Sequence, residues 1–152
     1  LRARPALESA VRTAIASTYI ELGEYDKAIR QIALDTAARR RAVPAGDYGL
    51  ATSISRLALA HEYAGRVATA DTLLRRAAAL YAVHPPPTPE EYATMLEDRA
   101  RILTALGRPD EARRMLDTAI AVQRADGTPI DSLIVFTYGN AARAASEAND
   151  QV

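Results

Sequence analysis

The stretch that decides the fold is residues 92–126, YATMLEDRARILTALGRPDEARRMLDTAIAVQRAD. Apolar residues recur at helical spacing on both sides of Gly107, which predicts two helices with one apolar face each. Gly107 suits the left-handed residue that closes a helix. Pro109, followed by Asp110 and Glu111, suits the first turn of the next helix. The stretch therefore predicts a helical hairpin.

The same pattern recurs along the chain with a period of 42 residues. Three columns carry it: Gly107, Gly65 and Gly23; Ala112, Ala70 and Ala28; and Ala100, Ala58 and Ala16. With only 7 glycines in the chain, three in one column are the stronger sign. A fixed period between about 20 and 50 residues is typical of a solenoid. The sequence predicts an all-α, right-handed superhelix of about three and a half helical hairpins, or about seven helices.

The periodic pattern extends over nearly the whole chain. We expect a single array over residues 1–152, with repeats at about 9–44, 48–86 and 89–127 and a terminal half-repeat at 129–149. Asp47 is a predicted N-cap, and Thr88 opens a predicted capping box with proline at the first helical position. Because the chain starts at Leu1 instead of Met, we expect a fragment of a larger protein.

Two features of the first repeat carry expectations about burial. The predicted apolar stripe of the first helix is Val11, Ile15, Tyr19 and Leu22. The run Arg39-Arg40-Arg41 is expected to complement the C-terminus of the second helix and to be solvated there. A patch that binds anions is the alternative for this run.

Composition excludes several classes of function. The chain has 19 basic and 19 acidic residues, so no net field favours nucleic acid or acidic membranes. It has no Cys, two His and no apolar run long enough to span a bilayer. Phosphate-binding glycine loops and nucleophile motifs are missing from the sequence. We therefore expect no enzymatic activity, no metal, no cofactor, no nucleic-acid partner and no membrane insertion.

The repeat resembles the tetratricopeptide repeat. The first copy carries the pattern best, in Ala16, Tyr19, Gly23, Tyr25 and Ala28. The period of 42 is similar to the long-hairpin class of kinesin light chains and of many bacterial signalling proteins. This resemblance implies a non-catalytic scaffold that binds a protein or peptide, as in the repeat region of a bacterial serine/threonine kinase or regulator. We expect a cytoplasmic location, or an extracytoplasmic one if the parent chain carries a transmembrane segment.

The resemblance also implies a concave wall formed by the first helix of each hairpin. Carried onto this chain, the groove residues are Ser17, Glu21, Arg56, Leu59, Tyr63, Asp98, Arg101, Asn140 and Arg143. The three arginines could bind carboxylates of an extended peptide, or each could pair with an acidic neighbour on the wall. The family's clamp for acidic chaperone tails needs Lys and Asn where this chain has Thr13 and Ser17. It also needs Asn in place of Arg56, and Lys and Arg in place of Thr94 and Asp98, so the clamp is missing.

The last predicted helix suggests an alternative function. It opens with Leu133, Ile134, Val135 and Phe136 and has no second helix to complete its hairpin. An uncovered apolar face at the end of a solenoid favours a symmetric partner. Homodimerisation through Val135 and Phe136 is therefore the alternative to peptide binding.

Overall fold

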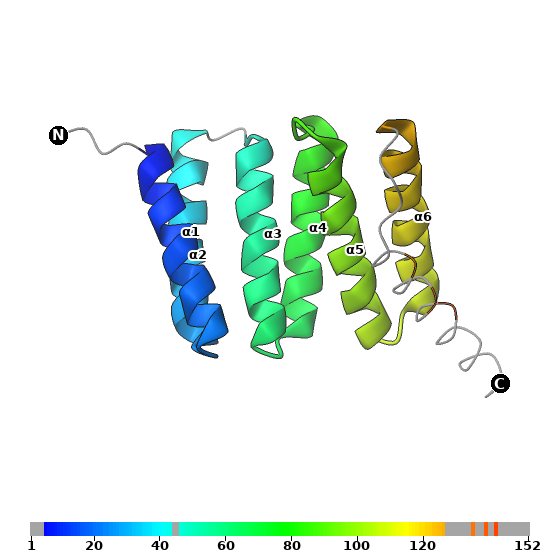
Figure 1. The fold of residues 1–152 in the computed structure, drawn as a ribbon, viewed down its shortest axis with the longest axis horizontal. Helices are drawn as coiled ribbons and strands as arrows, with labels where there is room; N and C mark the ends of the chain where they lie inside the picture. The colour runs from blue at the N-terminus through cyan, green and yellow to red at the C-terminus, as the bar shows by residue number, and fades with distance from the viewer. Residues whose placement is uncertain (1–4, 44–45, 127–134, 136–138, 140–141, 143–152) are drawn as a thin grey trace. The chain divides into compact units, whose positions relative to one another are not determined.

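The structure is a computed structural model that describes residues 5–43 and 46–126, together with Val135, Gly139 and Ala142 (Figure 1). These residues form six helices and no strand, which confirms the predicted all-α fold. The helices are α1 (Pro5–Glu21), α2 (Tyr25–Ala42), α3 (Tyr48–Tyr63), α4 (Val67–Val83), α5 (Pro89–Ala105) and α6 (Pro109–Asp126). The predicted seventh helix, apart from those three residues, lies outside the described part of the chain.

Three tight turns join α1 to α2, α3 to α4 and α5 to α6. Their glycines, Gly23, Gly65 and Gly107, have φ of 72°, 74° and 70°, the left-handed region that disfavours a side chain. At each turn, the glycine N–H donates to the carbonyl three residues earlier, and the next N–H donates to the carbonyl five residues earlier. This double closure satisfies the last carbonyls of the helix. It confirms the role predicted for the glycine column.

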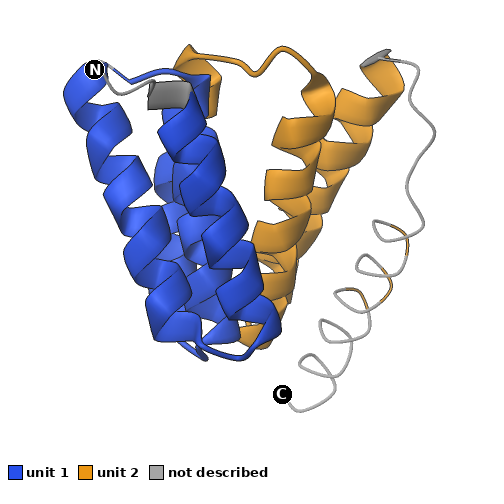
Figure 2. Cartoon of the chain, turned by 60° about the vertical axis from the view of Figure 1, so that its left-hand side comes forward, with its two compact units in different colours: residues 1–80 blue, residues 81–152 orange. Residues whose placement is uncertain are grey.

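The chain divides into two compact units, residues Leu1–Leu80 and Tyr81–Val152, coloured separately in Figure 2. In unit 1 the core gathers Ala16, Ala28, Ile32 and Ala60, with Tyr19 and Leu57 packed against them. In unit 2 the largest fully buried side chains are Met95, Ile102, Leu103 and Leu116. All six alanines of the two alanine columns are buried. Small side chains at these positions allow neighbouring helices to approach closely.

Helix starts follow the predicted signals in one case and depart from them in another. Asp47 caps α3, because its Oδ1 accepts a hydrogen bond of 2.7 Å from the Leu50 N–H. Thr88 precedes α5 in extended backbone, but its side chain makes no capping hydrogen bond. Pro89 at the start of α5 is as expected, since the missing N–H of proline is unpaired at that position anyway.

The apolar stripe of α1 is only partly buried. Ala16 is in the core, whereas Val11 is 49% exposed and Ile15 is also exposed. The expectation that these two residues face the core is therefore wrong. Helical periodicity identifies an apolar face, but not whether another helix covers it.

Among the described helices, none is long and apolar enough to cross a membrane.

Candidate functional site

A hollow of about 300 Å³ opens on unit 1 where α1, α2 and α3 meet. We call it the unit-1 hollow. Its lining residues are Thr13, Ala16, Ser17, Ile20, Glu21, Ile32, Arg56, Leu59 and Tyr63. Five of the groove residues carried over from the family resemblance are in this set, so the fold brings Ser17, Glu21, Arg56, Leu59 and Tyr63 together on one surface.

The unit-1 hollow combines an apolar floor with charged residues at its edge. Ala16 and Ile32 are buried, and Leu59 is half-buried. Arg56 and Glu21 are exposed, and neither forms an ion pair or side-chain hydrogen bond with another residue in the part of the chain that the structure describes. An exposed guanidinium with no counter-ion keeps its five N–H donors available for a carboxylate from outside.

One aromatic ring, that of Tyr63, lines the hollow. Tyr63 stacks on Tyr25 with ring centroids 6.2 Å apart and an interplanar angle of 19°. Lys27 Nζ lies 5.7 Å from the centroid of Tyr19. Rings that are already packed against a neighbour lose little side-chain entropy when a ligand contacts them. Tyr63 is 52% exposed, so its ring remains accessible from the hollow.

The predicted groove residues of unit 2 are arranged differently. Arg101 donates a hydrogen bond of 2.8 Å from Nη2 to Asp98 Oδ1, one helical turn earlier on α5. Burial raises the pKa of Asp98 to about 6, and burial also lowers the pKa of Arg101. The hydrogen bond from Arg101 therefore does not offset the hydration that Asp98 loses. The sequence left two possibilities for each groove arginine, binding a carboxylate of a peptide or pairing with an acidic neighbour. Arg101 pairs with its acidic neighbour Asp98.

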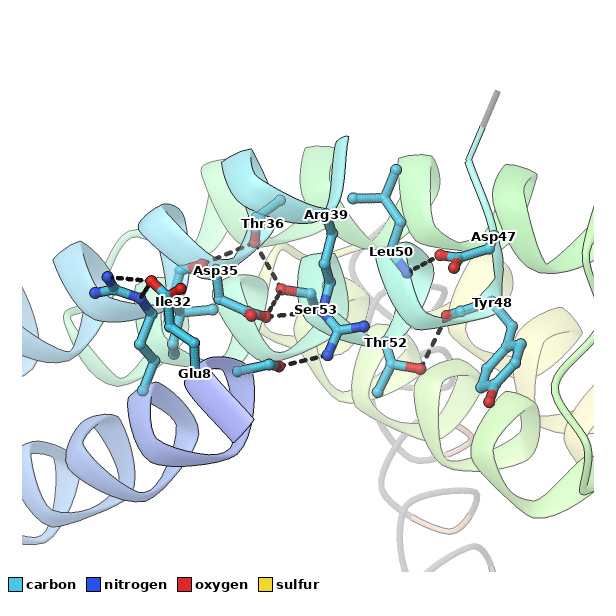
Figure 3. Close-up of polar contacts among 12 residues, drawn as sticks. Glu8, Ile32, Asp35, Thr36, Arg39, Asp47, Tyr48, Leu50, Thr52 and Ser53 are labelled. Atoms are coloured by element: carbon cyan, nitrogen blue, oxygen red, sulfur yellow. Dashed lines mark hydrogen bonds and ion pairs between the residues drawn. The ribbon is translucent and has the colours of Figure 1, made fainter. Parts of the chain in front are cut away.

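A buried polar network joins α1, α2 and α3 in unit 1 and uses none of the predicted groove residues (Figure 3). Asp35 on α2 is 5% exposed. Its Oδ2 accepts hydrogen bonds from Ser53 Oγ at 2.8 Å and from Arg39 Nε at 3.0 Å. Burial alone would raise the pKa of Asp35, but hydrogen bonds from Ser9, Ser53 and Arg39 outweigh it and hold the pKa below its ordinary value. The buried carboxylate is thus fully satisfied as an anion.

Arg39 connects the three helices of this network. Besides Asp35 on its own helix, it donates to Ser9 Oγ on α1. A Cβ at Gly49 on α3 would lie 2.7 Å from Arg39 Nη1, so the guanidinium fills the space that a side chain at Gly49 would need. The prediction of a solvated run is therefore wrong for Arg39, whereas Arg40 and Arg41 are exposed in the last turn of α2, as expected. The alternative, an anion-binding patch, gains no support at Arg39, because Nε and Nη2 already donate hydrogen bonds to Asp35 and Ser9.

Sequence reasoning missed this network, although one signal was visible. Asp35 occupies the column in which the later repeats have Ala77 and Ala119. A carboxylate in a column of buried alanines needs donors nearby. Ser53 stands in the column of Val11 and Met95, and it is the polar exception there. Two polar exceptions in two buried columns could have identified the pair.

The remaining predicted residues are at the C-terminal end. Asn140, Arg143 and Phe136 lie outside the described residues, and Val135 is 62% exposed. Within the described residues, no group of three or more His, Cys, Asp or Glu side chains is placed to hold a metal ion.

Comparisons with known proteins connect this geometry to a family. Residues 93–125 and residues 9–32 each match a sequence model of the tetratricopeptide repeat. No curated protein matches the chain in sequence.

Three solved structures share the fold. Nearly identical TPR-like repeats assigned to a kinesin light chain of Podosopora anserina match with a TM-score of 0.78 and 19% identity, over 99% of this chain and 72% of that one. A TPR-like protein from Chlorobium tepidum TLS matches with a TM-score of 0.68 and 14% identity, over 96% and 97%. MamA matches with a TM-score of 0.56 and 16% identity, over 93% and 81%.

The sequence matches cover two of the predicted repeats, and the structural matches cover nearly the whole chain. Proteins built from this repeat are generally scaffolds for protein–protein interaction. Residues 9–32 and 93–125 are thus tetratricopeptide repeats, and the chain has the fold of TPR-like repeat proteins.

Proposed function

We propose that the chain is a non-catalytic scaffold and that the unit-1 hollow holds a segment of another protein. The observation that carries this proposal is Arg56, an exposed arginine without a counter-ion among the described residues, next to an apolar floor. The guanidinium would bind a carboxylate of the segment. The floor at Ile20 and Leu59 would take an adjacent apolar side chain. Charge-assisted hydrogen bonds are the stronger kind, and apolar burial adds to them.

Size supports a small ligand segment. A hollow of about 300 Å³ is at the lower end of ligand pockets, which are roughly 300–1,000 Å³. This volume has room for a few side chains of an extended or helical peptide. Glu21 at the edge of the hollow would accept a hydrogen bond from a basic side chain or an amide of the same segment. The proposed ligand is therefore a peptide with an acidic residue close to an apolar one.

A synthetic peptide array tests this function. Each peptide of about 12 residues carries one Leu and one Asp at varied separation, with an Asn version of every peptide as its partner, and binding is measured by fluorescence anisotropy. We expect Asp peptides to bind about tenfold or more tightly than Asn peptides, because a hydrogen bond to a charged group contributes about 1.5–3 kcal/mol. Arg56→Gln should remove this preference, whereas the matched control Arg101→Gln, whose arginine is already paired, should keep it. Equal binding of both peptide sets, or a preference that survives Arg56→Gln, contradicts the proposal.

Self-association is a second candidate function, favoured by the exposure of Val135. We infer that Val135, with its predicted neighbour Phe136, would pack against a second copy. Light scattering over a range of concentrations should then show a dimer that Val135→Asp dissociates. A monomer at every concentration contradicts this candidate and leaves peptide binding untouched.

We further propose that the chain is the repeat region of a larger bacterial signalling protein that acts in the cytoplasm, such as a serine/threonine kinase or a regulator. Its support is the Arg- and Ala-rich repeat sequence, which is similar to the arrays of such proteins. A full coding sequence that joins these repeats to a kinase or regulator domain would support the proposal, and one that joins them to an unrelated domain would contradict it.

A further inference from the structure

The first helix leaves a wide apolar face uncovered. On α1, Leu7 is 61% exposed and Val11 is 49% exposed, and Ile15 is exposed as well. At about 100° per residue, these positions and the exposed Ala10, Ala14 and Thr18 share one side of the helix. No residue of this set is charged, and the exposed Glu21 ends this side of the helix at its last residue. The terminal helix of a repeat array normally has a polar outer face, so this face is unusual for an array end.

Two positions at the centre of this face are buried one repeat later. A shift of 42 residues takes Val11 to Ser53 and Thr18 to Ala60, which are 1% and 0% exposed. Helix α2 provides the cover in unit 1, since Ser53 Oγ bonds to Asp35 and lies 2.8 Å from Thr36 Oγ1. Ala60 belongs to the core that includes Ile32 of α2. The second helix of the preceding hairpin therefore covers this face of α3.

A second shift of 42 residues reaches the same positions on α5. Met95 stands where α1 has Val11, and Ile102 stands where α1 has Thr18. Met95 and Ile102 are both buried. The two positions are thus buried on α3 and α5 and exposed only on α1. In addition, α1 and α5 both begin with proline in the same register, at Pro5 and Pro89.

The residue at the centre of the face determines which helix can cover it. On α3 the centre is Ser53, whose hydroxyl donates to Asp35 of the covering helix. On α1 the centre is Val11, which has no donor for a carboxylate. A helix with Asp at the position of Asp35 would lose that hydrogen bond against Val11. On α4 the position is occupied by Ala77, an apolar residue that leaves no such group unpaired.

We propose that the exposed face of α1 docks the second helix of one more hairpin of this repeat type, joined ahead of Pro5, and that this hairpin carries a small apolar residue at the position of Asp35. We call the pair Asp35–Ser53 the polar key. It restricts a helix with Asp at the position of Asp35 (α2-type) to a neighbour with Ser at the position of Ser53 (α3-type). Val11 accepts an α4-type helix and rejects an α2-type helix. The chemistry of one position therefore determines the order in which hairpins can stack.

A fusion of residues 5–152 to a second copy of residues 48–88 tests the docking. Residue 88 is joined to Pro5, because Pro89 and Pro5 have the same register. We expect the fusion to melt several degrees above the unfused chain in one transition, since the new contacts stabilise both partners. Amide hydrogen exchange on α1 should slow at least tenfold. An added hairpin that melts separately and leaves exchange on α1 unchanged overturns the proposal.

Two substitutions in the fusion test the polar key. Ala77→Asp in the added copy should remove most of the gain in melting temperature. Adding Val11→Ser should return part of it, because the new hydroxyl can donate to the carboxylate as Ser53 does to Asp35. A gain that is insensitive to Ala77→Asp overturns the key. In the unfused chain, a concentration-dependent dimer that Val11→Asp abolishes would identify a second copy as the occupant and overturn the docking of a preceding hairpin.

Discussion

Units 1 and 2 use the same two helical positions in opposite ways. On α3 these positions are Arg56 and Leu59, and 42 residues later on α5 they are Asp98 and Arg101. Residues three apart on a helix are neighbours, so Arg101 pairs with Asp98 at 2.8 Å. Arg56 has an apolar neighbour instead and forms no ion pair within the described residues. Whether an arginine remains available to a partner is thus determined by the residue three positions away.

The two units also differ in how they hold a carboxylate. Asp35 in unit 1 accepts hydrogen bonds from three side chains, and its pKa is lowered. Asp98 in unit 2 accepts one from Arg101, and burial raises its pKa to about 6. At Asp35 the hydrogen bonds and the charge of Arg39 outweigh burial, whereas at Asp98 burial outweighs the single hydrogen bond. A carboxylate with several donors stabilises the fold as an anion, whereas one with few donors is penalised for being charged.

The largest expected effect is the loss of the satisfied carboxylate. Asp35→Ala leaves Arg39 and Ser53 without their acceptor, and breaking a buried pair on one side costs roughly 3–5 kcal/mol. Urea unfolding should show this loss at pH 7. Glu8→Ala, which removes the exposed partner of Arg12, is the control and should change stability by less than about 1 kcal/mol. If both variants lost the same amount, the network around Asp35 would not be a special contributor.

The pH dependence of Asp98 is the next largest effect. Its folded pKa of about 6 lies above the value of about 3.9 for an unfolded Asp, so the stabilising contribution is complete below pH 4 and is lost as pH rises through 6. The loss between pH 4.5 and 7.5 is about 2 kcal/mol by linkage. Asp98→Asn should remove this component in urea unfolding at the two pH values. Asp35 has the opposite sign, because its lowered pKa makes stability fall as pH drops below about 4. An unchanged pH dependence in Asp98→Asn contradicts the assignment.

Converting unit 1 toward the pattern of unit 2 should weaken peptide binding. Leu59→Asp puts a carboxylate three positions after Arg56, where it competes for the guanidinium as Asp98 does for Arg101. We expect the affinity for an Asp-containing peptide to fall about tenfold below that of the control Leu59→Asn, equivalent to about 1.4 kcal/mol. The control has a similar side chain without charge, so it separates the ion pair from the lost apolar floor. Equal affinities for the two variants would show that Arg56 is not the anchor.

The smallest expected effect is at Gly49. Gly49→Ala adds a Cβ 2.7 Å from Arg39 Nη1, so the guanidinium has to move. The better helix propensity of Ala offsets part of this, which leaves a net loss of about 1 kcal/mol or less. In the double variant with Arg39→Ala the loss from Gly49→Ala should disappear, because the crowding atom is gone. A loss that persists without Arg39 would point to another cause.

Most of the fold could be predicted from the sequence because the information is periodic. The glycine column identifies the three left-handed turns at Gly23, Gly65 and Gly107, and the alanine columns identify the close helix contacts. The sequence predicts helices over about 5–22, 48–64 and 67–83, and the structure has α1 at Pro5–Glu21, α3 at Tyr48–Tyr63 and α4 at Val67–Val83. A signal repeated at a fixed interval is robust against the exceptions of any single copy.

The rest depends on pairings between particular side chains. Arg39 was expected in solvent, yet it reaches Ser9 on another helix, a contact 30 positions away that no local pattern contains. Val11 was expected in the core, yet periodicity shows only that a face is apolar and not that a helix lies on it. Arg56 and Arg101 were equivalent candidates in the sequence. The contacts of α3 and α5 distinguish them, since only Arg101 finds a carboxylate on its own helix.

The most direct test of the account is the NMR signal of the Arg56 side-chain Nε–Hε group during titration with an Asp-containing peptide from the array. The account predicts that the Arg56 signal shifts and saturates with the binding curve, while the Arg101 signal stays in place because its guanidinium is already paired. A peptide that binds while the Arg56 signal remains unchanged would contradict the central claim that this uncommitted arginine anchors the partner.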